Sequence, residues 1–219
     1  MGKEILTPRQ LALLGAVAGS PEFSASVYLT GGTALAAFYL NHRESEDLDF
    51  FSETEIDPLA VETFLQSQKK ELGFAKFEFQ KSFNRNLYFL EYEDGALKTE
   101  FTYFPFPRLE SGTQEGHLHI DSLRDIAVNK TFAISQQARG RDFIDLYCIL
   151  RDKHWRLGDL RRDARLKFDA NIDLVQFGSQ LLKVRDLKDL PRLRIPLAWN
   201  YVAAFFLAEA SELKKDILA

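Results

Sequence analysis

The stretch Asp47-Leu48-Asp49-Phe50-Phe51 constrains the fold more than any other part of this sequence. Apolar residues alternate with two acids in it, which predicts a β-strand. Residues two apart in a strand share one face, so the carboxylates of Asp47 and Asp49 project together from an otherwise apolar strand. Like charges this close repel, and one carboxylate would take up a proton unless a cation lies between them. The stretch therefore predicts a sheet strand with a cation-binding acidic site.

Two other segments complement this acidic pair. Gly31-Gly32 follows a strand-like run, and glycines let the backbone approach a phosphate closely, while the helix N-terminus that follows offers free N–H donors and Thr33 adds a hydroxyl. Glu100, on a later strand-like run, completes an acidic triad if its strand lies beside the first. Mg²⁺ prefers such oxygen ligands, and a triad can hold two metal ions. Each motif alone is weak evidence, but their order along the chain predicts a phosphate and metal site.

The predicted secondary structure changes after Pro105 and Pro107. Before them, helical patterns alternate with strand-like runs that end in a β-meander over residues 74–103, whereas residues 108–116 predict a loop. From Ser122 onward nearly every segment predicts helix. We therefore expect an α+β fold, with an α/β domain over residues 1–115 and an α-helical domain over residues 116–219. The expected helices of the second half are Ser122–Gln136, Arg141–Lys153, Leu160–Phe168, Ile172–Lys183 and Pro196–Lys215.

Composition excludes several other classes of protein. The single cysteine, Cys148, rules out an internal disulfide and a multi-cysteine zinc site. No apolar run approaches the roughly 20 residues that span a membrane, and no signal-peptide pattern opens the chain. We therefore expect a cytoplasmic protein without a membrane partner. The net charge of −4 argues against a protein that binds nucleic acid over most of its surface, but it is compatible with a local basic patch.

Two stretches resemble a known family. The segment LTGGTALAAFYLNHRESEDLDFF is similar to the first motif of the AbiEii/AbiGii-type toxins, which belong to the polymerase β-like nucleotidyltransferase superfamily. The segment DIAVNKTFAISQQARGRDFIDLYCIL is similar to the later lysine and Arg-Asp-x-x-Asp-Leu motif of that family. Together they cover about a quarter of the chain and bracket most of it. The resemblance implies a polymerase β-like nucleotidyltransferase domain, a mixed sheet flanked by helices, followed by an α-helical domain.

The resemblance also implies roles for individual residues. Asp47, Asp49 and Glu100 would be the catalytic, metal-binding acids, with Mg²⁺ or Mn²⁺ as the cofactor. The lysine at position 130 would contact the triphosphate and take part in catalysis. The remaining nucleotide-binding residues would be Gly31, Gly32, Thr33, Arg43, Asp142 and Asp145. The family usually has Gly-Ser where this chain has Gly-Gly-Thr.

The residues themselves leave alternatives open. Lys130 lies among apolar neighbours and needs an anionic partner, which would be either a bound triphosphate or Asp142 and Asp145. Those two acids lie three apart on one helix face and could equally form an ion-pair network with a structural role. The run Arg161 to Lys167 is basic enough to meet phosphates, although a solvated helix face is the commoner role of such a run.

The predicted activity is transfer of a nucleoside monophosphate from a metal-bound NTP to an acceptor hydroxyl. The resemblance suggests RNA, with a tRNA 3′ end as one candidate acceptor, and a cognate antitoxin protein as a partner. A protein or a small molecule is also compatible as the acceptor. Two other classes remain compatible with the sequence: a non-catalytic NTP-binding partner in a toxin–antitoxin complex, and a phosphotransfer enzyme that uses the same phosphate cradle.

Overall fold

The computed structural model describes residues 3–218 and divides into two compact units, with the division between Ser122 and Leu123. In the described part of the chain, every strand lies in the first unit and the second unit is helical. The expected α+β fold, with a mixed sheet flanked by helices and a helical C-terminal region, is confirmed. The sequence-based domain boundary at residue 115 falls before strand β7 (Leu118–Ile120), which pairs with β1 and so lies in the first unit.

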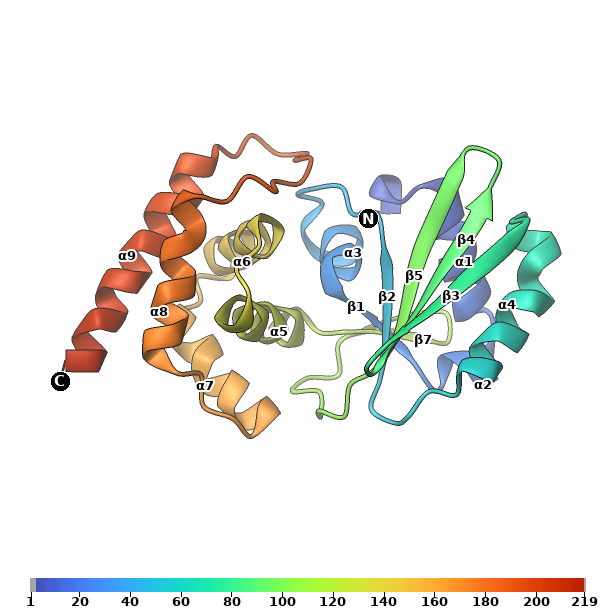
Figure 1. Cartoon of the computed structure of the whole chain (residues 1–219), viewed down its shortest axis with the longest axis horizontal. Helices are drawn as coiled ribbons and strands as arrows, with labels where there is room; N and C mark the ends of the chain where they lie inside the picture. The colour runs from blue at the N-terminus through green and yellow to red at the C-terminus, as the bar shows by residue number, and fades with distance from the viewer. Residues whose placement is uncertain (1–2, 219) are drawn as a thin grey trace. The chain divides into compact units, whose positions relative to one another are not determined.

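The first unit alternates helices and strands in its first half and then forms the expected meander (Figure 1). Its elements are the 3₁₀ turn η1 (Lys3–Ile5), α1 (Pro8–Ala18), α2 (Pro21–Ser24), β1 (Tyr28–Thr30), α3 (Gly31–Leu35), the π-helical turn η2 (Ala36–Leu40), β2 (Leu48–Ser52), α4 (Pro58–Leu72), β3 (Lys76–Ser82), β4 (Arg85–Tyr92), β5 (Gly95–Tyr103), β6 (Thr113–Glu115) and β7.

The described strands form one seven-stranded sheet in the order β3-β4-β5-β2-β1-β7-β6. The sheet is mixed, because β2 pairs antiparallel with β1 but parallel with β5, and β1 pairs parallel with β7. The expected loop over residues 108–116 is wrong in part, since Thr113–Glu115 forms the edge strand β6 against β7. Three polar residues carry no alternating apolar pattern, so only the pairing with β7 defines this strand.

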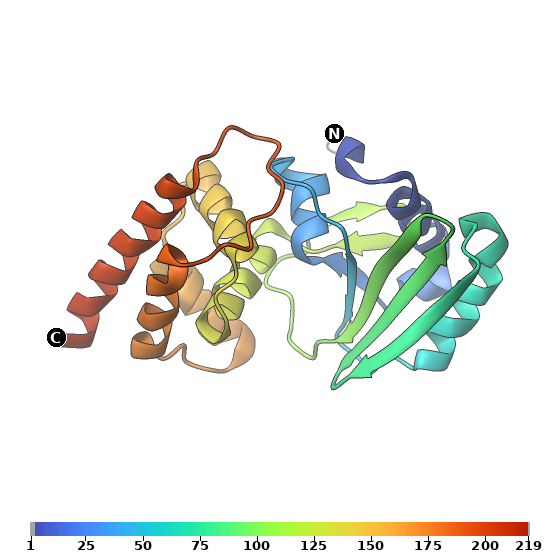
Figure 2. The same cartoon turned by 45° about the horizontal axis from the view of Figure 1, so that its top comes forward.

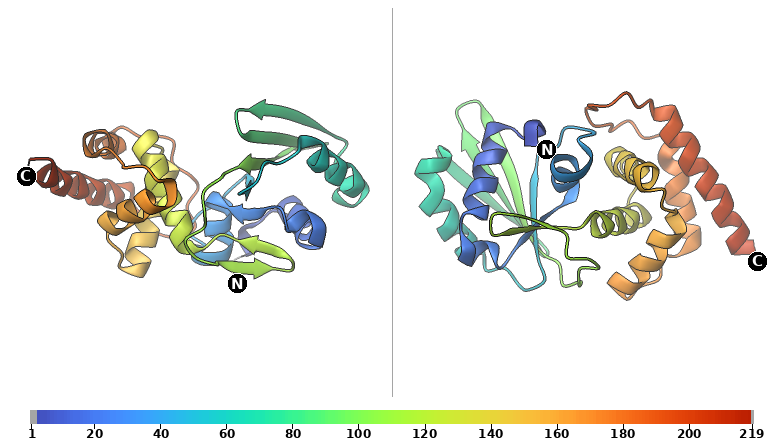
Figure 3. Two further views of the ribbon diagram at one scale, coloured as in Figure 1. Left: turned by 90° about the horizontal axis from the view of Figure 1, so that it is seen from below. Right: turned by 180° about the vertical axis from the view of Figure 1, so that it is seen from behind.

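The two faces of the sheet differ in chemistry. One face packs against α1, α2 and α4, as the views in Figures 1 and 3 show. On that face Phe50 of β2 stacks on Phe101 of β5 with ring centroids 5.0 Å apart, and Phe23 of α2 lies against both Phe101 and Phe64 of α4. Helix α3 lies on the other face. The side chains that alternate with Phe50 and Phe101, including Asp49 and Glu100, therefore project to the α3 side.

Local signals fix the helices around the sheet. Thr7 and Gln10 form the capping box of α1, in which Thr7 Oγ1 accepts from the Gln10 amide and Gln10 Oε1 accepts from the Thr7 amide. Asp57 caps α4 at its start, and Gly73 ends it in the left-handed conformation (φ +72°). The residue types at these positions therefore favour the observed helix ends.

The second unit is built around helix α5, which packs against α6, α7 and α8, while α9 lies along α8 (Figure 2). Its elements are α5 (Leu123–Gln136), α6 (Gly140–Lys153), α7 (Leu157–Phe168), α8 (Leu174–Leu182), the 3₁₀ turn η3 (Lys183–Arg185) and α9 (Trp199–Leu218). The five expected helices are all present, and α9 begins three residues later than the predicted start at Pro196. Among the residues that the structure describes, none of the helices is long and apolar enough to span a bilayer.

An ion pair lies inside this helical unit. Lys167 of α7 and Asp125 of α5 are both fully buried, and their Nζ and Oδ1 atoms are 2.6 Å apart. Removing one partner of such a pair leaves a buried charge without its counter-ion, which costs far more than losing an exposed pair.

We expect Lys167→Met to lower the free energy of unfolding by about 3–5 kcal/mol, because Asp125 then loses its counter-ion. Denaturant unfolding measures the change. The control is Lys153→Met on the exposed end of α6, which should change stability by less than about 0.5 kcal/mol. A loss below about 1 kcal/mol in the Lys167 variant would show that the buried pair does not stabilise the unit.

Candidate active site

The acidic pair lies at the start of β2 on the α3 side of the sheet. Asp47 directly precedes β2, Asp49 is the second residue of the strand, and both are partly exposed while Leu48 and Phe50 are buried. The predicted alternation is therefore present. The strand pairing places Asp49 between Thr30 of β1 and Glu100 of β5 as Cα partners.

The Gly31-Gly32 turn lies directly against this pair. Gly31 has φ +75°, and a Cβ atom added there would lie 2.5 Å from Oδ2 of Asp49. A Cβ atom on Gly32 would overlap the guanidinium of Arg43. The two glycines are thus required for different reasons, because one admits the Asp49 carboxylate and the other admits Arg43. Bare backbone at this point is also what a close approach of a phosphate needs.

Thr33 and Arg43 are buried beside the turn. Thr33 donates its hydroxyl hydrogen bond to the main-chain oxygen of Asp47, which ties α3 to the start of β2. Arg43 is only 3% exposed, and its Nη1 donates to the main-chain oxygen of Glu44 at 2.8 Å. Both therefore shape the loop that leads into the acidic pair, whatever contact they make with a nucleotide.

Gln10 is a positioning residue that the sequence did not reveal. Its side chain is 1% exposed, and its Nε2 donates to the main-chain oxygen of Ser45 at 2.8 Å while its Oε1 completes the cap of α1. The same side chain thus fixes the start of a helix and the loop before the acidic pair. A glutamine three residues after Thr7 predicts the cap, but no sequence signal predicts the second contact.

Glu100 is bound by two side chains of the sheet. Arg85 of β4 donates from Nε to Oε1 at 2.7 Å and from Nη2 to Oε2, and the Thr102 hydroxyl donates to Oε1 at 2.5 Å. Burial alone would raise the pKa of the Glu100 carboxyl, but these hydrogen bonds outweigh it and hold the pKa below its usual value. The hydrogen bond to Glu100 likewise raises the pKa of Arg85. Glu100 is therefore held as a carboxylate at neutral pH.

Lys98 is a second basic residue of the site that sequence reasoning missed. It lies two residues before Glu100 on β5, and its Nζ is 2.7 Å from Oδ2 of Asp47. Residues two apart in a strand share one face, so the sequence spacing alone predicts that Lys98 lies on the same face as Glu100. Arg85 was harder to find, because its place opposite Thr102 depends on the register of β4 against β5.

These contacts decide how well the acids fit a divalent ion. Asp47 and Asp49 share a face, and Mg²⁺ typically uses one or two carboxylates together with water and substrate phosphates. Glu100 has both carboxylate oxygens engaged by Arg85. Within residues 3–218, no three His, Cys, Asp or Glu side chains converge as a metal-binding cluster. The aspartate pair therefore fits Mg²⁺ or Mn²⁺ by its donor chemistry, while the part of Glu100 as a third ligand stays a prediction.

The remaining predicted residues lie together in the second unit. Lys130 of α5 contacts two acids of α6, with its Nζ 2.5 Å from Oδ1 of Asp142 and 2.9 Å from Oδ2 of Asp145. All three side chains are nearly or fully buried. Of the two alternatives that the sequence left open for Lys130, this structure contains the ion-pair network. The predicted site residues thus form two groups, one in each unit.

Comparison with known proteins shows the family to which the chain belongs. A family model described as nucleotidyl transferase AbiEii toxin, type IV TA system, matches residues 12–212. The chain belongs to this family. An Aquifex aeolicus (strain VF5) protein described as uncharacterized protein aq_aa25 is 31% identical over 189 residues, covering 84% of this chain and 86% of that protein. The resemblance inferred from the two sequence motifs is therefore confirmed.

Solved structures agree in fold with this AbiEii-family chain. JHP933 from Helicobacter pylori is 20% identical with a TM-score of 0.59, covering 98% of this chain and 91% of that protein. MenT4, the nucleotidyltransferase toxin Rv2826c from Mycobacterium tuberculosis H37Rv, is 15% identical with a TM-score of 0.54, covering 94% and 90%. At this identity the likeness shows the fold alone. The fold and the family together make the chain a nucleotidyltransferase toxin by class.

The pair between Arg85 and Glu100 predicts a pH-dependent stability. We expect Arg85→Gln to lower the free energy of unfolding by about 2 kcal/mol at pH 7 in metal-free buffer, less than for a fully buried pair because Arg85 is half exposed. A carboxyl with a lowered pKa stabilises the folded state above its unfolded pKa of about 4.3 and loses this effect as the pH falls. The difference between wild type and variant should therefore shrink in acid.

Denaturant unfolding at several pH values measures this difference. Arg108→Gln is the control, since Arg108 pairs with the exposed Glu53 and its loss should cost less than about 1 kcal/mol with little pH dependence. A constant difference from neutral to acid pH would mean that Arg85 does not hold Glu100 ionised.

The contact between Gly31 and Asp49 gives a second prediction. A methyl group at Gly31 must displace the Asp49 carboxylate and strain the backbone, and a displacement of about 1 Å at a reacting centre costs about 10²-fold in rate. We expect Gly31→Ala to reduce nucleotidyl transfer by that factor. Gly15→Ala in α1, where the added methyl meets nothing within 4 Å, should leave transfer unchanged. Equal activity of both variants would place the reacting centre elsewhere.

Proposed function

We propose that this chain transfers a nucleoside monophosphate from an NTP, bound with Mg²⁺ or Mn²⁺, to a hydroxyl group of an acceptor RNA. The observation that carries the proposal is the contact of the Gly31 backbone with the Asp49 carboxylate, beside Asp47. The turn proposed to accept the phosphates and the acids proposed to bind the cation are thus adjacent in one unit. Membership of the AbiEii family supports the same chemistry.

The proposed reaction is an in-line displacement at the α-phosphate. The acceptor hydroxyl oxygen forms a bond to the α-phosphorus, the bond to the β-phosphate oxygen breaks, and pyrophosphate leaves. The metal, when bound, acts as a Lewis acid that stabilises charge on the phosphate oxygens. Asp47 and Asp49 hold that cation, and the Gly31-Gly32 backbone receives the phosphates.

Glu100 is the proposed acceptor of the hydroxyl proton. A general base must be ionised before it acts, and the lowered pKa of Glu100 meets this condition at neutral pH. The bond to Arg85 also weakens Glu100 as a base, so Arg85 would have to release one carboxylate oxygen during the reaction. In this proposal Arg85 is a positioning residue.

Basic residues that now pair with acids are the proposed contacts for the triphosphate. Lys98 is held by Asp47, and Lys130 by Asp142 and Asp145. A phosphate would compete with these carboxylates for the ammonium groups. Asp142 and Asp145 would then keep Lys130 positioned, which reconciles their ion-pair network with a part in nucleotide binding. The type IV toxin–antitoxin description of the family further suggests a cognate antitoxin protein as partner, in the cytoplasm.

Transfer from labelled NTPs tests the proposal. With α-³²P-labelled NTPs, total RNA and Mg²⁺, we expect label on RNA from the wild type and a loss of at least about 100-fold in Asp49→Asn, the scale for losing one electrostatic group at a reacting centre. Asp94→Asn, at an exposed turn, is the matched control and should keep full activity.

The position of the label separates the outcomes. Label from α-³²P but not from γ-³²P nucleotides means nucleotidyl transfer, whereas label from γ-³²P nucleotides alone would mean phosphoryl transfer and overturn the proposal. Transfer that survives in Asp49→Asn would remove the acidic pair from the mechanism.

A further inference from the structure

The face of the sheet that carries the candidate acids continues onto β4. Strand pairing makes Leu87 the Cα partner of Glu100 and Phe89 the Cα partner of Lys98. Directly paired residues of antiparallel strands lie on the same face, so Leu87 and Phe89 lie on the side that carries Asp49 and Glu100. Both side chains are half-buried. An apolar surface therefore begins directly beside Glu100, on the strand next to β5 (Figure 1).

Phe89 differs from the aromatic residues around it on β3 and β4. On the opposite face, Phe77 and Phe79 pack against Tyr88, with ring centroids 5.6 and 5.1 Å from the centroid of Tyr88. Within residues 3–218, Phe89 makes no ring contact. Aromatic packing inside the sheet therefore does not account for a ring at this position, and its free surface is suited to stacking.

The neighbours of Leu87 and Phe89 on β3 favour an uncharged ligand. Phe89 pairs with Glu78, which is exposed and lies 4.0 Å from the equally exposed Lys76. Leu87 pairs with Gln80, an exposed amide. An acid beside the ring repels a phosphate group, whereas a nucleobase can stack on the ring and exchange hydrogen bonds with the amide. This surface therefore suits the base of a nucleotide better than its phosphate.

The order of the strands assigns this base to the acceptor. The sheet runs β1, β2, β5, β4, so the Gly31-Gly32 turn lies on one side of Asp49 while Leu87 and Phe89 lie on the other. In the proposed reaction the phosphates of the NTP lie at the glycine turn. The attacking and leaving oxygens are in line, so the hydroxyl approaches the α-phosphorus from the opposite side. The molecule that supplies the hydroxyl therefore lies over β5 and β4.

We propose that Leu87 and Phe89 form the subsite for the terminal base of the acceptor RNA, with the base stacked on Phe89 and Gln80 at its edge. The identity of the acceptor rests on the proposed function, whereas the surface rests on the register of β3, β4 and β5. Neighbouring strands lie about 4.8 Å apart. A nucleoside whose hydroxyl lies at Glu100 therefore places its own base over the neighbouring strand.

RNA binding without NTP or Mg²⁺ tests the subsite. The probes are two 5′-fluorescein RNAs of one sequence, one of them abasic at its 3′-terminal nucleotide, and anisotropy gives their dissociation constants. We expect the wild type to bind the complete RNA about five- to 150-fold more tightly than the abasic RNA, the range for stacking one base on an aromatic side chain. Phe89→Leu keeps an apolar side chain but removes the ring, so the ratio of the two constants should fall below about two.

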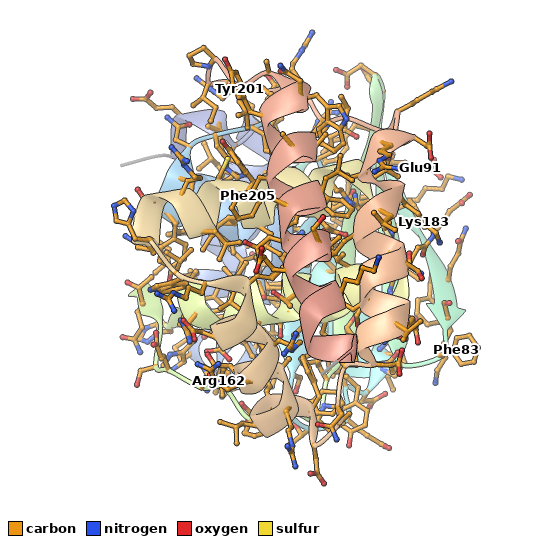
Figure 4. The ribbon with its side chains drawn as sticks, turned by 90° about the vertical axis from the view of Figure 1, so that its left-hand side faces the viewer. Phe83, Glu91, Arg162, Lys183, Tyr201 and Phe205 are labelled. Carbon is orange, nitrogen blue, oxygen red and sulfur yellow. The ribbon has the colours of Figure 1, made fainter. Side chains whose placement is uncertain are left out.

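Two further variants control for effects on folding and on the hairpin. Phe89→Trp restores a ring and should retain the ratio, which separates loss of stacking from loss of packing. Phe83→Ala is the matched control, because Phe83 lies in the turn between β3 and β4, is 97% exposed and extends away from the ribbon in Figure 4. This variant should also keep the ratio. Thermal unfolding checks that each variant remains folded.

Each other outcome overturns the proposal. A wild type that binds both RNAs equally would have no subsite for the terminal base, and an unchanged ratio in Phe89→Leu would show that the ring does not contact it. Loss of the ratio in Phe83→Ala would assign the base to the hairpin turn. In transfer assays Phe89→Leu should raise the KM for RNA and leave the KM for NTP unchanged, whereas a rise for NTP alone would assign the surface to the NTP base.

The outcome for this subsite is separable from the outcome for the proposed function. Asp49→Asn should keep the ratio of the two RNA dissociation constants while it transfers no label. If the wild type transfers no nucleotide yet Phe89→Leu loses the ratio, the proposed function fails and the subsite stands. If transfer to RNA occurs but the ratio does not depend on Phe89, the subsite fails and the proposed function stands.

Discussion

Strand β2 is paired on both sides, antiparallel to β1 and parallel to β5, and the candidate site depends on this register. The pairing sets Asp49 beside Glu100 on one side and beside Thr30, the residue before the Gly31-Gly32 turn, on the other. A slip by one residue would turn Asp49 into the aromatic face and Phe50 to the polar α3 side. Packing of Phe50 on Phe101 opposes that slip, so the apolar face of the sheet determines the geometry of its polar face.

The sequence predicts the parts of the structure that local patterns control. The helix caps at Thr7 and Asp57, the hairpin between β4 and β5, and the two glycines before α3 follow from residue types at fixed spacing. Strand β6 could not be predicted, because three polar residues become a strand only by pairing with β7. The place of β7 next to β1 likewise moves the end of the first unit beyond residue 115.

The sequence indicates the acids of the candidate site more directly than the basic residues that pair with them in the sheet. Asp47, Asp49 and Glu100 stand out because acids interrupt apolar strands. Lys98 lies two residues before Glu100 and so shares its face of the strand, but nothing in the local pattern of β4 separates Arg85 from a solvated residue. Their partners depend on which strands are neighbours and in which register, and this information is distributed over the whole sheet.

Oppositely charged side chains of the candidate site pair within each unit. Lys98 pairs with Asp47, Arg85 with Glu100, and Lys130 with Asp142 and Asp145. Such pairing lets acids and lysines remain partly buried without a ligand, since an unpaired buried charge is costly. In the proposed function, a nucleotide with its metal carries charges of both signs and would exchange partners with the ion pairs of the first unit. Binding would then redistribute existing ion pairs, and its free energy would depend on the difference between old and new partners.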